Sequence, residues 1–175
     1  MEAAANEPFF LFIQREVFEP LGMNDTRPDS ADRDVPNRAS FYFPRFATRT
    51  RLGLHPTRPV DYSCFSGGGA FLSTPSDLVR FGSAMMNGTL LRPGTIALLQ
   101  APLRLESGAS TDYGLGWKVE TVTLRAARAR LIGHDGSPFG GTASLMTFSP
   151  PAAPTRSAST TASGFFAATP LAHLR

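Results

Sequence analysis

The chain has 175 residues, of which 42% are hydrophobic and 18% are charged, so it can build a packed core within one domain or part of one. No apolar run approaches the roughly 18 residues needed to cross a bilayer, which excludes a membrane span. The single cysteine, Cys64, excludes an internal disulfide. The three histidines, His55, His134 and His173, show no paired ligand spacing, so we expect neither a structural zinc site nor a cofactor.

The N-terminal residues have the pattern of a helix from about Glu7 to Glu19. Asn6 is suited to cap it, and Phe9, Ile13 and Val17 repeat every four residues on one face. The sequence Glu-Pro-Leu-Gly that follows predicts its end, because proline disfavours helix in the residue before it.

Residues 23–64 lack a sustained period and are rich in proline and arginine. Such a stretch is long for a loop, which predicts that it packs on a larger body. Its arginines suit a solvated surface. Its aromatic residues are not spaced as a stacking platform for bases, so we expect no nucleic-acid partner.

A second helix is strongly marked. Thr74 to Asp77 form a capping-box pattern with a proline at the first helical position, and Asn87-Gly88 predicts the end. A short helix from Gly94 to Gln100 follows.

The third part of the chain changes to strand character. We expect strands over Tyr113–Leu124, Leu131–His134 and Thr142–Phe148, the last two separated by a glycine-rich turn, Gly136–Gly141. Helices followed by consecutive strands predict an α+β fold with an antiparallel sheet. Residues 151–175 are rich in Pro, Ala, Ser and Thr, and we expect there a poorly ordered tail with no further strand.

Four phrases occur together in order: Phe12–Met23, Gly67–Phe81, Tyr113–Trp117 and Gly133–Ser137. They resemble the segments F-x-P-L-G-M, G-G-x-x-S-T-x-x-D-L-x-R-F, Y-G-L-G-W and G-H-x-G of a family of serine hydrolases. That family is related to class C β-lactamases, penicillin-binding D-Ala-D-Ala carboxypeptidases and the mitochondrial β-lactamase-like protein. The resemblance implies that residues 1–150 form the C-terminal part of a β-lactamase/transpeptidase-like domain.

The resemblance also implies acyl transfer through a serine activated by the lysine of a Ser-x-x-Lys motif, with the tyrosine of a Tyr-x-Asn motif moving the proton. Neither motif is present. The only lysine is Lys118, and Leu115 lies three residues before it. The tyrosines Tyr42, Tyr62 and Tyr113 are followed two positions later by Pro, Cys and Leu. Both motifs would precede Met1, so we expect a truncated hydrolase that is inactive alone.

By the same resemblance, His134, Gly136 and Ser137 remain from the cleft. The side chain of His134 would face the substrate carboxylate or leaving group, and the backbone N–H of Ser137 would be an oxyanion donor beside Gly136. A hydrogen-bonded, inert histidine at a strand end is the alternative. The glycines around His134 favour the cleft, because they allow a ligand to approach the backbone. We interpret Trp117 as a core residue.

The sequence leaves three hypotheses for the function of this chain. The first is a β-lactamase-like hydrolase of amide or ester substrates that is incomplete in this chain, so its status as an enzyme is open. The second is a non-catalytic binding or assembly module of the same family, and the third is a basic nucleic-acid-binding fragment. The expected partners are a small-molecule or peptide-like acyl substrate and a complementary N-terminal half.

Overall fold

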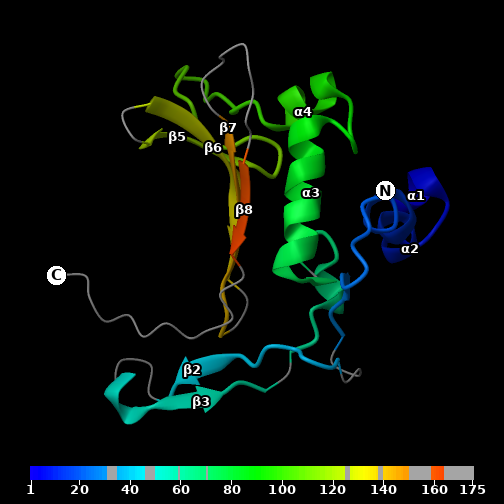
Figure 1. The fold of residues 1–175 in the computed structure, drawn as a ribbon, viewed down its shortest axis with the longest axis vertical. Helices are drawn as coiled ribbons and strands as arrows, with labels where there is room; N and C mark the ends of the chain where they lie inside the picture. The colour runs from blue at the N-terminus through cyan, green and yellow to red at the C-terminus, as the bar shows by residue number, and fades with distance from the viewer. Residues whose placement is uncertain are drawn as a thin grey trace.

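The computed structural model describes residues 1–30, 35–45, 50–58, 60–69, 71–124, 127–137, 140–149 and 159–163. A four-stranded antiparallel sheet stands beside a long helix, with the N-terminal helices beyond that helix and a two-stranded hairpin at one end of the sheet (Figure 1). This arrangement confirms the predicted α+β fold.

The N-terminal helix differs from the prediction. Instead of one helix capped by Asn6, there are α1 (Glu2–Ala5) and α2 (Phe9–Ile13), and α2 continues as a π-helix over Gln14–Phe18. Asn6 ends α1 with a φ of 54°, in the left-handed region that asparagine tolerates, so it cannot begin the next helix. Phe9, Phe10 and Phe18 surround Phe71, with ring centroids 5.2–6.2 Å from its own. This aromatic packing anchors the N-terminal helices.

Helix α3 (Pro75–Asn87) begins and ends as predicted. The Thr74 hydroxyl accepts the backbone N–H of Asp77 at 3.2 Å, which satisfies one of the free donors of the first turn. Gly88 ends the helix with a φ of 75°, and a short helix, α4 (Pro93–Leu99), follows it.

The carboxylate of Asp77 is fully buried and ties α3 to the preceding segment. One oxygen accepts the backbone N–H of Asp25 at 3.0 Å and the hydroxyl of Thr26 at 2.8 Å, and the other pairs with Arg80 at 2.8 Å. Beside this contact, β1 (Arg27–Pro28) pairs with β4 (Phe71–Leu72). Asp77 therefore joins segments about fifty residues apart.

The main sheet has the order β5-β6-β7-β8, with β5 at Lys118–Leu124, β6 at Ala127–Gly136, β7 at Ala143–Ser149 and β8 at Ser159–Ser163. All its neighbouring strands are antiparallel, as predicted. The strand β8 lies where we expected none. It adds to the edge of β7, whereas the other residues from 150 to 175 lie outside the described part of the chain.

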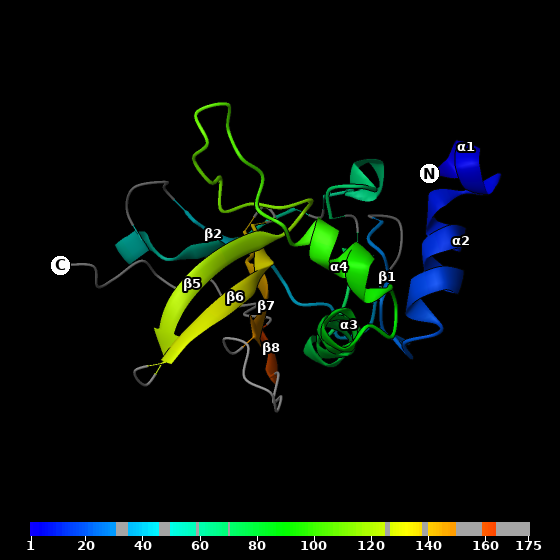
Figure 2. The same ribbon diagram turned by 90° about the horizontal axis from the view of Figure 1, so that it is seen from above.

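The core lies on one face of this sheet. Val119, Ile132 and Thr147 are register partners, so their side chains share that face, and all three are buried. Arg130 on the same face donates to the carbonyl of Gln100, just after α4, at 3.3 Å. The face therefore looks toward the helices, and α3 runs beside β7 and β8 in both ribbon views (Figure 2).

The predicted strand from Tyr113 begins five residues late, at Lys118. Tyr113 to Trp117 form a turn instead, closed by a hydrogen bond of 2.7 Å from the Gly114 N–H to the Trp117 carbonyl. Gly116 has a φ of 81°, which breaks the extended backbone that the alternating sequence suggested. Trp117 is half-buried and stacks on Phe81 of α3, with ring centroids 6.3 Å apart.

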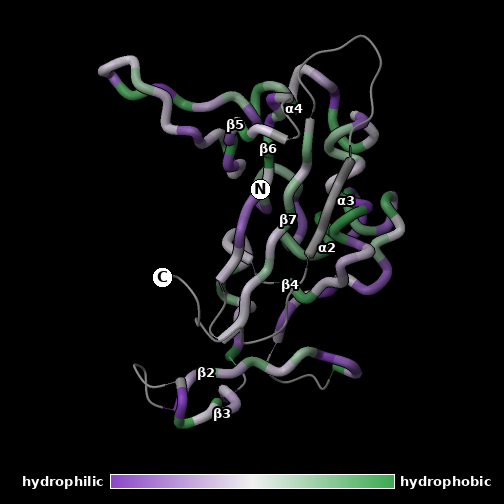
Figure 3. Tube along the Cα trace, turned by 60° about the vertical axis from the view of Figure 1, so that its left-hand side comes forward, coloured by the Kyte–Doolittle hydropathy of each residue, from purple (hydrophilic) through white to green (hydrophobic). Residues whose placement is uncertain are grey.

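The proline- and arginine-rich stretch contains a small hairpin. Its strands β2 (Tyr42–Pro44) and β3 (Leu54–Pro56) are antiparallel, and two 3₁₀ turns, Thr50–Leu52 and Ser63–Phe65, lie within and after it. Hydrophilic and hydrophobic residues mix along this hairpin (Figure 3). It packs on the turn after β6, where the Tyr42 N–H donates to the Gly140 carbonyl at 3.2 Å. The stretch thus packs on a larger body, as predicted.

Candidate functional site

His134 lies near the end of β6 and is exposed, although its imidazole is held at both nitrogens. Its Nδ1 is 2.6 Å from the backbone carbonyl of Asp135, and its Nε2 is 2.7 Å from the hydroxyl of Tyr113. A carbonyl can only accept, so Nδ1 carries the proton. In the neutral ring Nε2 then has the lone pair, and Tyr113 is the donor.

Tyr113 reaches this contact from the turn before β5, and its backbone is fixed on both sides. Its carbonyl accepts the N–H of Leu103 at 2.9 Å, and the next residue, Gly114, is clamped against α4. A Cβ on Gly114 would overlap the carbonyl oxygen of Leu99 and lie 3.1 Å from that of Ala101. The two rings meet edge to face, with centroids 5.8 Å apart and planes at 80°. A rigid backbone therefore presents the phenol to His134.

Sequence reasoning named His134 but did not find Tyr113 as its partner. The residues are 21 positions apart, and only the strand register brings them together. Tyr113 bridges to Lys118, and Lys118 is the register partner of Gly133, the neighbour of His134. The Y-G-L-G-W phrase drew attention to the segment, but no spacing pointed to this contact.

The glycines near His134 serve the sheet and the hairpin. A Cβ on Gly133 would overlap the Leu145 carbonyl oxygen and lie 2.6 Å from the sulfur of Met146, so this glycine lets β7 approach. Gly140 and Gly141 make room for Phe41 in the same way. At Gly136 an added Cβ would meet only ordinary contacts, the nearest being the Cβ of Ala143 at 3.8 Å. For Gly133, Gly140 and Gly141 our ligand-approach interpretation was therefore wrong, because protein atoms already fill the space where a side chain would lie.

Gly136 and Ser137 are exposed at the end of β6, directly after His134 and Asp135. Residues 138 and 139 lie outside the described part of the chain. Asp135 points to the opposite face from His134, since strand side chains alternate, and it accepts the Ser144 hydroxyl at 2.7 Å. The two predicted backbone positions thus lie together with His134 at one strand end.

Lys118 does not join this group. The buried side chain of Val119, the next residue, lies on the same face of the sheet as His134. Side chains alternate along a strand, so Lys118 points to the opposite face. There its amine is 2.6 Å from a carboxylate oxygen of Glu120. This hydrogen bond and the Glu120 charge, together with the charge of Asp135, raise the pKa of the Lys118 amine. A raised pKa keeps the amine protonated, which is the reverse of what a general base needs.

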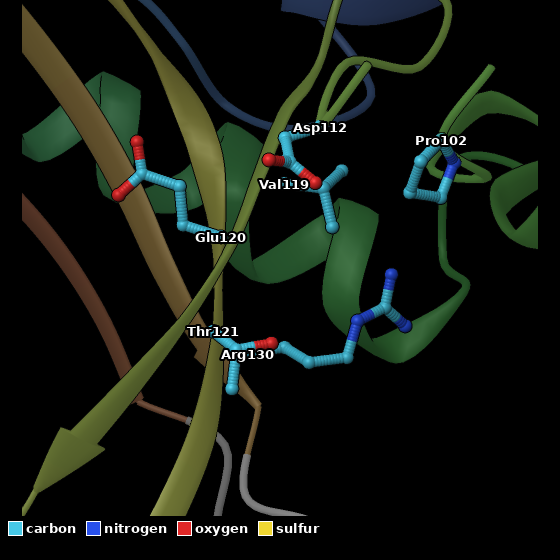
Figure 4. A pocket seen from close by; sticks show the side chains of 6 residues that line it. All are labelled: Pro102, Asp112, Val119, Glu120, Thr121 and Arg130. Carbon is cyan, nitrogen blue, oxygen red and sulfur yellow. The ribbon is translucent and has the colours of Figure 1, made fainter. Parts of the chain in front are cut away.

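A hollow of about 590 Å³ lies further along the sheet and is lined by Pro102, Asp112, Val119, Glu120, Thr121 and Arg130. The guanidinium of Arg130 extends toward Pro102, whereas Glu120 points to the other side of the strand (Figure 4). None of the three predicted site residues lines this hollow.

Within the described ranges, no group of three or more His, Cys, Asp or Glu side chains is arranged to hold a metal ion. The helices in this same part of the protein are all too short or too polar to cross a bilayer.

Comparison with known proteins supports the resemblance. Penicillin-binding protein 4* of Bacillus subtilis (strain 168) is 26% identical over 144 residues, which are 78% of this chain and 31% of that protein. The mitochondrial serine beta-lactamase-like protein LACTB of Mus musculus is 27% identical over 159 residues, 81% of this chain and 28% of that protein. The chain thus spans less than a third of the length of these relatives.

Solved structures show the same fold. A D-stereospecific amidohydrolase from a Streptomyces species superposes with a TM-score of 0.67 at 19% identity, over 83% of this chain and 42% of that one. A penicillin-binding protein from Bacillus halodurans gives 0.60 at 18% identity, over 93% of this chain and 47% of that one. The beta-lactamase family model matches residues 1–163. The chain therefore belongs to the beta-lactamase family, whose members include penicillin-binding and LACTB-type proteins.

Proposed function

We propose that this chain supplies one wall of an acyl-transfer cleft and that its nucleophile comes from residues outside these 175. His134 faces the carboxylate or leaving group of an amide or ester substrate, Gly136 keeps the strand end open, and the Ser137 N–H is one oxyanion donor. The chain alone then binds acyl substrates weakly and does not turn them over.

The observation that carries this proposal is the exposed His134 imidazole, oriented by Tyr113 at the end of β6. Tyr113 lies 21 positions away in the sequence, so the fold and not the local chain brings the phenol to His134. Gly136 and Ser137 follow directly, and both residues are exposed at the strand end. Because both ring nitrogens of His134 are already engaged, the donor to a developing negative charge in this group would be the backbone N–H of Ser137.

The absence of a nucleophile rests on the sequence. These residues contain no Ser-x-x-Lys and no Tyr-x-Asn motif. The only lysine, Lys118, lies on the other face of the sheet in an ion pair with Glu120. Serine is a weak nucleophile without an adjacent base, and losing the nucleophile in a serine enzyme costs about 10⁶ in rate. Oxyanion donors alone cannot compensate for this loss.

The test is reconstitution. The chain is assayed alone, and then mixed with a separately expressed N-terminal segment that carries both motifs. The probes are nitrocefin, p-nitrophenyl acetate and D-phenylalanine amide, since one relative is named as a penicillin-binding protein and one solved structure of similar fold is a D-stereospecific amidohydrolase. We expect no turnover from either part and turnover from the pair.

Two variants give the controls. Serine to alanine in the Ser-x-x-Lys motif of the added segment should abolish the restored activity. His134→Ala in this chain should reduce it by about tenfold to a hundredfold, whereas His55→Ala on the hairpin should leave it unchanged. Turnover by the chain alone would refute the proposal, and a pair that binds but never turns over would favour the assembly module.

A further inference from the structure

We propose that Tyr113 is a positioning residue that fixes the tautomer and orientation of His134. The functional consequence rests on the cleft proposed above, but the geometry stands on this chain's own residues. In the neutral pair, the Tyr113 hydroxyl donates to Nε2, and Nδ1–H donates to the carbonyl of Asp135.

The first support is that both contacts are short and involve both ring nitrogens, at 2.7 and 2.6 Å. Each ring nitrogen of a neutral imidazole has one role, either donor or acceptor. The Asp135 carbonyl can only accept, so it favours the proton on Nδ1, and the Tyr113 hydroxyl adds to this preference by donating to the lone pair that is left on Nε2. The edge-to-face ring contact at 80° prevents the imidazole from turning over freely.

The second support is that Tyr113 is held independently of His134. The N–H of Leu103, the bridge to Lys118 and the tight approach of Gly114 to Leu99 all fix its backbone. The backbone of His134 is likewise held by its place in β6, so the phenol and the imidazole meet in one arrangement. This is the arrangement expected of a residue that orients another one.

The arrangement has a chemical consequence for a ligand. Because the phenol proton points to His134, the Tyr113 oxygen offers its lone pairs outward as an acceptor. A ligand group with an N–H or O–H, such as a substrate amide, matches this acceptor. If Nε2 gains a proton, it becomes the donor, and the phenol proton is released to face the ligand.

The experiment reads the tautomer directly. The chain is labelled with ¹⁵N, and the imidazole nitrogens of His134, assigned with His134→Gln, are observed by two-bond ¹H–¹⁵N spectra above the titration range. Free imidazole side chains favour the proton on Nε2. We expect wild-type His134 to carry it on Nδ1 and Tyr113→Phe to shift the population toward Nε2. Tyr42→Phe, on the hairpin, should change nothing.

Several results would overturn the proposal. A wild-type proton on Nε2 is incompatible with donation from Tyr113, and it decides the matter even if Tyr113→Phe fails to fold. An unchanged tautomer in a folded Tyr113→Phe would do the same. In the reconstituted pair, Tyr113→Phe should lower kcat/KM by about tenfold, the effect of one lost hydrogen bond. Failure of reconstitution would refute the proposed function, whereas the tautomer measurement would still test the role of Tyr113.

Discussion

Replacing Gly133 by alanine tests how closely β6 and β7 approach beside the candidate site. The added Cβ would overlap the Leu145 carbonyl oxygen and lie 2.6 Å from the sulfur and 2.9 Å from the Cα of Met146. Ordinary contacts between carbon atoms are roughly 3.5–4.0 Å, so the strands must separate by about 1 Å. Backbone atoms cannot rotate away as a flexible side chain can, so the cost falls on the strand ladder.

The expected loss follows from two terms. Overpacking costs about 1–3 kcal/mol, and one weakened ladder hydrogen bond adds about 1 kcal/mol. Alanine gains back roughly half a kcal/mol because it restricts the unfolded chain. We therefore expect a loss of about 3 kcal/mol in the free energy of unfolding and a fall in Tm of about 10 °C.

The assay is urea unfolding followed by the fluorescence of Trp117, the only tryptophan. Gly136→Ala is the matched control, because it lies on the same strand and its new Cβ would meet nothing closer than 3.8 Å. It should change stability by less than about 0.5 kcal/mol. If Gly133→Ala were as stable as Gly136→Ala, the close approach of the strands would be disproved.

Three further predictions concern other parts of the fold. Asp77→Ala should lower the free energy of unfolding in urea by about 3 kcal/mol, because it leaves the N–H of Asp25 and the hydroxyl of Thr26 without their buried acceptor. The control Ser76→Ala, at an exposed position, should lower it by less than about 0.5 kcal/mol, and equal losses would contradict the role of Asp77. Thr74→Ala should cost about 1 kcal/mol by the same assay through loss of the helix cap, and no loss would show that the cap contributes nothing. Burial raises the pKa of Asp29 above 3.8, despite the opposing charge of Arg38 and with a smaller raise from Asp61. The carboxyl of Asp29 then binds its proton more tightly in the folded state than in the unfolded state. As pH rises from about 3.8 through the folded pKa, the stability of the wild type should therefore fall relative to that of Asp29→Asn. A difference between the two urea midpoints that stays constant across this range would contradict the direction.

Local signals predicted the helices well where four or five neighbouring residues decide the outcome. The Thr74 cap and the Gly88 end are of this kind, since each depends only on adjacent backbone groups. The cap at Asn6 was wrong because Asn6 takes a left-handed conformation that ends a preceding helix, α1. Both outcomes suit asparagine, and only the flanking helix decides between them.

The strands show where sequence patterns stop being informative. Leu115, Trp117 and Val119 alternate as a strand would, yet the close approach of Gly114 to α4 and the positive φ of Gly116 form a turn. The strand β8 has no apolar alternation, and its partner is β7. In both places contacts distant in sequence decide the local structure.

The candidate site was predictable in part. The family phrase located His134, Gly136 and Ser137, which lie together at one strand end. The hydrogen bond from Tyr113 depends on the register of two strands and a turn, which no spacing in the sequence gives. The role of Gly133 was misjudged because a glycine beside a site looks the same whether a ligand or a neighbouring strand occupies the space.

Intact-protein mass spectrometry most directly tests the central claim, that these residues contain no activated nucleophile. The chain is incubated with benzylpenicillin or a fluorophosphonate probe, and the same treatment is given to the chain mixed with the motif-bearing N-terminal segment. The chain should keep its unmodified mass in both samples, and the adduct should form only on the added segment. A covalent adduct on any hydroxyl of this chain would contradict the account.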